Sequence, residues 1–131
     1  MAEFAEYFEN AIINLMRNVA FTEVAVYVGL FTDSSSVADL EAGTITEEVT
    51  GGSYARELAG LSAASEGTSS NAGDITFTTA TGDWGIVTYI ALMDAITAGN
   101  VLMHTALDAA KTVNTGDTFV ISTGDLDVAV T

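Results

Sequence analysis

The sequence predicts a mostly β protein: an antiparallel β-sandwich of about seven or eight strands that follows one N-terminal α-helix. Apolar residues alternate with a period of two along much of the chain after residue 23. Turn signals interrupt this alternation at intervals of about ten residues, and no helical pattern separates the strands as a parallel sheet requires. We therefore expect a single domain, with the helix in residues 1–22 and the sandwich in residues 23–131.

The N-terminal segment, residues 3–19, has the spacing of an amphipathic helix. Its large apolar residues recur at intervals of three or four and form one stripe: Phe4, Phe8, Ile12, Leu15 and Val19. Acids in the first turn and a cation near the last turn suit the helix dipole. In one interpretation the stripe packs on the core of its own chain. In the alternative, its first four residues dock on a neighbouring subunit, which makes them candidate interface residues.

The first predicted strand, Val24 to Phe31, is apolar on both sides of its alternation, which is typical of a central strand covered on both faces. Thr32 to Gly43 contains Asp and several Ser residues and is predicted to be a loop. Ile45–Val49 and Ser53–Leu58 are the next candidate strands. The Gly51–Gly52 pair between them suits a tight hairpin turn.

The stretch from Ser62 to Gly73 has no periodicity and is predicted to be an exposed loop. Five further candidate strands follow it: Ile75–Thr79, Trp84–Met93, Val101–Leu107, Thr118–Ser122 and Leu126–Val130.

Three Thr-Gly-Asp triplets and one Ala-Gly-Asp triplet punctuate these strands. Glycine permits a positive φ and Asp bonds to nearby backbone, so the triplets predict turns. The alternative, a set of Ca²⁺ loops, needs acids at alternate positions, and only Asp125 and Asp127 come close.

The charge balance excludes several classes of partner. The chain has 18 acidic residues against Arg17, Arg56 and Lys111, which gives a net charge of −15. Phosphate backbones and anionic membranes are bound through clustered Lys and Arg, so we expect neither nucleic acid nor membrane as a partner. The acidic N-terminus does not resemble a secretory signal, and the apolar runs are too short for a spanning helix.

Residues suited to catalysis or metal binding are scarce. His104 is the single histidine and lies in an apolar strand, and the chain has no cysteine. Glu47 and Glu48 are adjacent, so on a strand they would point to opposite faces. We expect no enzyme activity and no catalytic, cofactor or metal site, while two distant carboxylates flanking a glycosidic bond stay open as an alternative. Trp84 is expected to anchor the core.

Tyr54 and Arg56 are two residues apart and would share one face of a strand. They form either a small polar contact at an interface or a solvent-facing pair, and the sequence favours neither.

The order of segments resembles a known family. A short helix is followed by VYVGLFT, GGSYAR, DITF, DWGIVTYIALMDA, GNVLMHTAL and KTVNTGDTF. This order, from about Val19 onward, resembles small virion proteins of tailed bacteriophages that are labelled tail fibre, minor structural or head decoration proteins. The resemblance implies a non-enzymatic subunit without cofactors, assembled as a homotrimer or other homo-oligomer.

The same resemblance implies partners and a location. The partners would be the major capsid protein or tail proteins, and the location would be the virion, assembled in the host cytoplasm. The first interpretation is a capsid decoration or cement protein on the head exterior. The alternative is a tail-fibre or tail-tip subunit that contacts the host surface, and a glycan-binding module or glycosidase is a third class.

Overall fold

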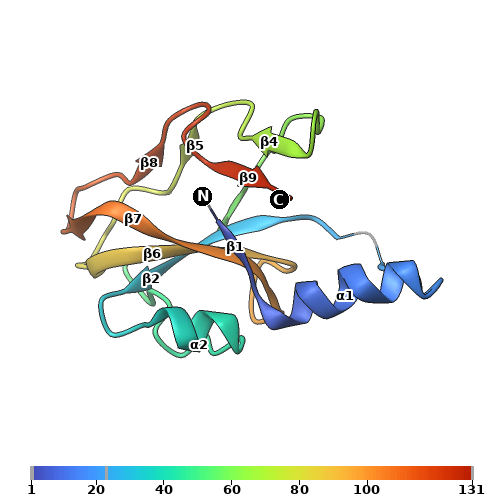
Figure 1. Cartoon of the computed structure of the whole chain (residues 1–131). Helices are drawn as coiled ribbons and strands as arrows, with labels where there is room; N and C mark the ends of the chain where they lie inside the picture. The colour runs from blue at the N-terminus through green and yellow to red at the C-terminus, as the bar shows by residue number, and fades with distance from the viewer. Residues whose placement is uncertain (1, 23, 131) are drawn as a thin grey trace.

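Strands make up most of the regular structure of this protein (Figure 1). The computed structural model describes residues 2–22 and 24–130. The elements in chain order are β1 (Glu3–Phe4), α1 (Glu6–Met16), β2 (Tyr27–Thr32), α2 (Val37–Glu41), β3 (Glu57–Leu58), β4 (Thr68–Ser70), β5 (Ile75–Thr76), β6 (Gly85–Met93), β7 (Val101–Val113), β8 (Val120–Ile121) and β9 (Asp127–Ala129). The predicted class, mostly β with an N-terminal helix, is confirmed.

Five strands form the main antiparallel sheet, in the order β1-β7-β6-β2-β3. Two small two-stranded sheets, β4-β9 and β5-β8, lie above it in Figure 1, while α1 and α2 lie below it. The longest pairing joins β6 to β7 through the turn at residues 94–100. There, Asp94 accepts hydrogen bonds from the backbone N–H (2.7 Å) and the side chain (2.9 Å) of Asn100.

The larger core fills the space between the main sheet and the small sheets. Its fully or nearly fully buried side chains include Val28, Leu30, Phe77, Trp84, Val87 and Leu126. Phe77 packs edge-on against Phe119, with ring centroids 5.6 Å apart. Burial of this apolar surface is the main favourable term that holds the two layers together.

A second, smaller core lies on the opposite face of the main sheet, under α2. It contains Ala5, Phe31, Leu40, Ala91, Met93 and Val101. Because successive residues of β2 point to opposite faces, Leu30 enters one core and Phe31 the other. The prediction of a central strand covered on both sides is therefore confirmed from Tyr27 onward, while residues 24–26 of the predicted strand precede β2.

The helices differ from the prediction: α1 begins at Glu6 and ends at Met16 instead of spanning residues 3–19, and a second helix, α2, was not predicted. Residues 3–4 form a strand instead of helix, because β1 pairs with Met103 and His104 of β7 and the N–H of Ala5 donates to Leu102 (2.9 Å). The predicted loop after β2 contains α2. Its N-terminus is capped by the Ser36 hydroxyl, which accepts a hydrogen bond from the N–H of Asp39 (3.1 Å).

The hairpin predicted around Gly51–Gly52 is wrong. Ile45–Val49 makes only one isolated bridge, to β2, and β3 also pairs with β2 instead of with that segment. Both glycines have positive φ, and the carbonyl of Gly52 accepts hydrogen bonds from Trp84 Nε1 (2.9 Å) and the N–H of Thr81 (3.0 Å). Gly52 thus holds Thr81 and Trp84, which lie just before β6, in place.

The predicted exposed loop, residues 62–73, also contains a strand. β4 pairs with β9, which is more than fifty residues further along the chain. The last predicted strands exist, but β5, β8 and β9 are shorter than expected, while β7 extends to Val113.

Candidate subunit interface

Helix α1 leaves the body of the protein after about Ile12. Figure 1 shows it running away from the main sheet, and none of its residues is buried. Its base is held by an aromatic cluster in which Phe8 contacts Phe4 (5.6 Å between centroids) and Phe21 (5.5 Å). Of the predicted stripe, Phe4, Phe8 and Ile12 are half-buried against this base.

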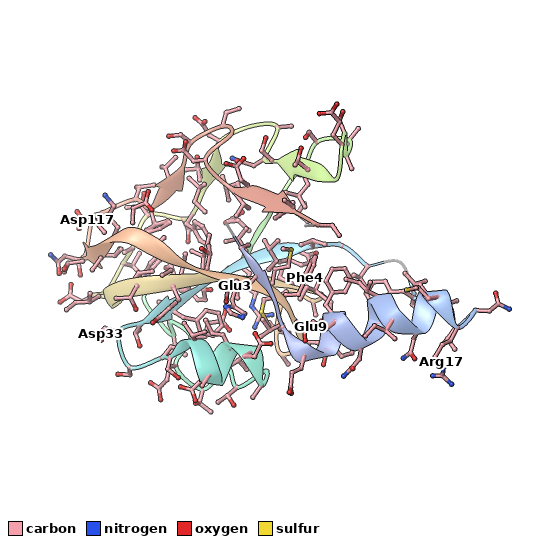
Figure 2. The ribbon with its side chains drawn as sticks, viewed as in Figure 1. Glu3, Phe4, Glu9, Arg17, Asp33 and Asp117 are labelled. Carbon is pink, nitrogen blue, oxygen red and sulfur yellow. The ribbon has the colours of Figure 1, made fainter. Side chains whose placement is uncertain are left out.

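The outer end of α1 and the segment directly after it expose three large apolar side chains, two from the predicted stripe and Met16 beside them. Leu15 is 52% exposed, Met16 is 86% exposed and Val19 is 47% exposed. We call these three residues the outer ridge. Figure 2 places Arg17 in this region, at the end of α1 furthest from the sheet. An eleven-residue helix is marginally stable by itself in water, so this part of α1 requires additional contacts to be well ordered.

An apolar groove opens beside the base of α1. It has a volume of about 430 Å³, and the described residues that line it include no charged side chain. It is lined by residues from the base of α1, the segment after α1, the segment before β4, and β9. We call this hollow the apolar groove. Among its lining residues are Phe8, Phe21, Val26, Leu61, Val128 and Val130.

A second hollow of about 320 Å³ lies between α1 and the segment that returns to β2. Phe21 and Val24 line both hollows, so this segment is loosely packed on either side. Val130, at the rim of the groove, is 66% exposed. The outer ridge and the groove are therefore neighbouring apolar surfaces that do not cover one another.

Tyr54 and Arg56 both bond the carboxylate of Glu48 within the chain. Arg56 is only 4% exposed and forms a forked ion pair with Glu48, with two N···O distances of 2.7 Å. Its remaining nitrogen donates to the carbonyls of Ala95 (2.7 Å) and Ala98 (2.8 Å), in the turn between β6 and β7. Of the two alternatives, the solvent-facing pair is therefore wrong for Arg56, and its burial within one chain disfavours a contact with another subunit.

Tyr54 completes the same network. Its hydroxyl donates to Glu48 Oε2 (2.7 Å) and accepts from the N–H of Leu30 (2.9 Å). Burial, followed by the charge of Glu48, raises the pKa of Tyr54 far above its usual value, so the hydroxyl keeps its proton. Burial by itself would lower the pKa of Arg56, but the hydrogen bonds and charge of Glu48 outweigh it and raise that pKa.

Gly29 makes room for this network. A Cβ at this position would lie 2.9 Å from Glu48 Oε2 and 3.5 Å from Arg56 Nε. The glycine of the VYVGLFT segment is therefore required for space at the carboxylate, and its φ is not in the left-handed region.

His104 and Trp84 are packed as structural residues. His104 is 2% exposed, and its Nε2 lies 2.8 Å from Glu41 Oε2, which fastens α2 to β7. Trp84 is 4% exposed and donates to Gly52, so its predicted role as a core anchor is confirmed.

The glycine–aspartate triplets are joined in pairs by hydrogen bonds from a Thr of one triplet to an Asp of another. Asp83 Oδ1 accepts from the N–H (2.9 Å) and hydroxyl (3.1 Å) of Thr115, and Asp74 accepts from the same groups of Thr123 (2.8 Å each). These bonds lower the pKa of Asp74. The turn interpretation is confirmed, with the addition that each of these Asp residues bonds a Thr of another triplet.

Two features are absent from the part of the chain that the structure describes. No group of three or more His, Cys, Asp or Glu side chains there is arranged to hold a metal ion. No helix in those residues has the length and hydropathy needed to cross a bilayer.

A family match covers nearly the whole chain. Residues 3–129 match a family model described as podophage GP4 fiber I protein gp80. No curated protein is significantly similar to the chain in sequence. The chain is therefore a structural component of a bacteriophage virion. It belongs to the family of podophage GP4 fiber I protein gp80, which confirms the resemblance to tailed-phage virion proteins.

Proposed function

We propose that this protein is a non-enzymatic subunit of a fibre on the phage particle and that it assembles in several copies, as a homotrimer or another homo-oligomer. The family description names a fibre protein, and it matches residues 3–129. The outer ridge of α1 is the observation that carries assembly, because three neighbouring large apolar side chains stay uncovered in the single chain.

The described side chains support a structural role over a chemical one. The single imidazole, His104, is buried and paired with Glu41, which leaves it no access to a substrate. Glu48 is occupied by Arg56 and Tyr54. Burial of apolar surface between subunits, at about 25 cal/mol per Å², then supplies the binding energy, and repeated weak contacts add through multivalency.

A second candidate is a capsid decoration protein that binds the major capsid protein on the head exterior. The described residues form a short body with one projecting helix and no extended shaft (Figure 1), a shape that suits a module lying on a shell. A fibre subunit would bind tail or other fibre proteins instead, and its exposed residues 62–68 would be available to a host receptor.

The number of copies in a virion separates these two functions. Quantitative mass spectrometry of purified particles should give a small multiple of the tail symmetry if the protein is a fibre subunit. Hundreds of copies would contradict the fibre proposal and support decoration.

Incorporation into particles tests the role of α1. We expect Leu15→Asp to reduce incorporation strongly, because the charge would have to be buried at a contact. Leu15 is exposed in the single chain, so the variant should still fold. Phe8→Asp should have the same effect, although Phe8 also supports the base of α1. Val120→Asp, at a 46% exposed position of β8, is the matched control and should be incorporated normally. Normal occupancy of Leu15→Asp would show that α1 is not the attachment surface.

A further inference from the structure

We propose that the outer ridge of α1 in one copy inserts into the apolar groove of a neighbouring copy. This inference rests on the proposed function, in which the protein assembles with itself, and it identifies the contact. The ridge consists of Leu15, Met16 and Val19. The apolar groove lies between the base of α1 and β9.

The ridge and the groove match in size. A cavity of roughly 150 Å³ lined by apolar side chains holds one benzene-sized group. At about 430 Å³, the groove therefore has room for about three groups of that size, and the ridge presents three aliphatic side chains. No charged side chain lines the groove on the described residues, so a charged ligand is disfavoured there and an apolar surface is favoured.

The charge distribution favours a second copy at this surface. Two chains that each carry a net charge of −15 repel one another, so they approach best where acids are sparse. The groove meets this condition, and Arg17 is placed beside the ridge. In Figure 2, Asp33 and Asp117 lie at the opposite end of the sheet from α1, while Glu9 lies at the base of the helix and Arg17 at its outer end.

The arrangement also permits a closed assembly. The ridge and the groove are adjacent, separated by Phe21 and Val24 in the segment after α1. A two-fold axis near this segment would exchange the two surfaces between partners, and a three-fold axis would pass the ridge of each copy to the next. In either case every ridge and every groove is covered, which gives α1 the packing that it lacks within one chain.

Cysteine crosslinking tests the contact directly, since the chain has no native cysteine. Met16→Cys chains mixed with Val130→Cys chains should form mixed disulfide dimers under mild oxidation, because the two Cα atoms would come within about 7 Å. Each single variant by itself, and the mixture of Met16→Cys with Val120→Cys, should crosslink much less. Equal crosslinking in all mixtures would overturn the proposal.

Sedimentation velocity of the full chain supplies the second test. The unmodified protein should associate, and association should strengthen as NaCl is raised from about 0.05 to 0.5 M, because salt screens the repulsion between acidic copies. Met16→Glu and Val130→Glu should each raise the dissociation constant of self-association by at least about tenfold, since each variant would bury an unpaired charge at the contact. Val120→Glu should leave it unchanged.

The outcomes of these tests separate this inference from the proposed function. A chain that stays monomeric at high concentration and high salt, yet is present as a fibre component in particles, would overturn the ridge-and-groove contact and leave the fibre function standing. If the chain still associates in both the Met16→Glu and the Val130→Glu variants, the ridge-and-groove contact is likewise overturned and the fibre function is left standing. If the chain associates through this contact but particles carry hundreds of copies, the inference stands and the fibre function fails.

Discussion

Arg56 organises more of the structure than any other single polar residue among those described. Its guanidinium joins Glu48, from the segment before β3, to the carbonyls of the turn between β6 and β7. Tyr54 extends the network to the backbone of β2. Three segments that are distant in sequence are thus fixed relative to one another by one forked group, a geometry that Lys cannot reproduce.

Removal of Arg56 should be strongly destabilising. We expect Arg56→Ala to lower the free energy of unfolding by about 3–5 kcal/mol, because Glu48 would keep a buried, uncompensated charge. Urea denaturation measures this change. Arg17→Ala, which loses only an exposed hydrogen bond to Asn14, should stay within about 0.5 kcal/mol of the unmodified chain. A loss for Arg56→Ala below about 1 kcal/mol would mean that the network contributes little.

The sequence indicated part of this network. Their spacing places Tyr54 and Arg56 on one face of a strand, but the pattern around Glu48 indicates only a strand and no partner for its carboxylate. The ion pair depends on the position of Gly29, where the missing Cβ leaves space for the carboxylate. Such space between segments far apart in the chain has no local sequence signal.

At the level of elements, α1 and the β6–β7 pair differ in how much of their packing the sequence predicts. The β6–β7 turn was predictable because Gly99 and Asn100 directly precede a regular strand. The period of the N-terminal segment likewise predicted α1. Periodicity, however, predicts only which face of a helix is apolar. It does not predict how much of that face the rest of the protein covers. Here the body covers α1 up to about Ile12 and leaves the outer ridge free.

The isolated chain should therefore show a weakly protected helix. We expect the backbone amides of the outer turns of α1 to exchange with deuterium nearly as fast as in an unfolded chain, while β2, β6 and β7 stay protected. The N-cap residue of α1 is Ala5, whose methyl side chain cannot accept a hydrogen bond, and this lowers the stability of the helix further. Hydrogen-exchange mass spectrometry of monomeric and assembled protein checks this: protection of α1 should rise on assembly. Strong protection in the monomer would contradict the expectation.

The short strand pairs mark the limit of the sequence-based prediction. β1 pairs with β7 about one hundred residues away, and β4 pairs with β9. Each pairing involves only two or three residues per strand. Alternation over so few positions cannot be distinguished from loop sequence, so residues 62–73 were predicted to contain no strand.

For the molecule as a whole, the dominant electrostatic feature is self-repulsion. Eighteen acids and three cations are present, and only Arg56 forms an ion pair with an acid among the described Lys and Arg residues. A large net charge keeps a protein soluble, but it also lowers the stability of the compact state.

Salt should consequently stabilise the fold. We expect the melting temperature to rise as NaCl is increased from about 0.05 to 0.5 M, by roughly 2–8 °C for each 1 kcal/mol of repulsion that is screened. Calorimetry of the Met16→Glu variant separates this effect from assembly, because that variant is designed not to associate. A melting temperature that is constant or falls with salt would show that repulsion is not limiting.

The burial of Trp84 has a practical consequence for optical experiments. It is the single tryptophan of the chain, it packs edge-on against Tyr54 at 5.4 Å between centroids, and it belongs neither to the outer ridge nor to the apolar groove. Its fluorescence therefore reports melting of the sandwich interior and should be insensitive to contacts made through α1. Emission and light scattering, recorded together on one sample, then distinguish loss of the fold from separation of the copies.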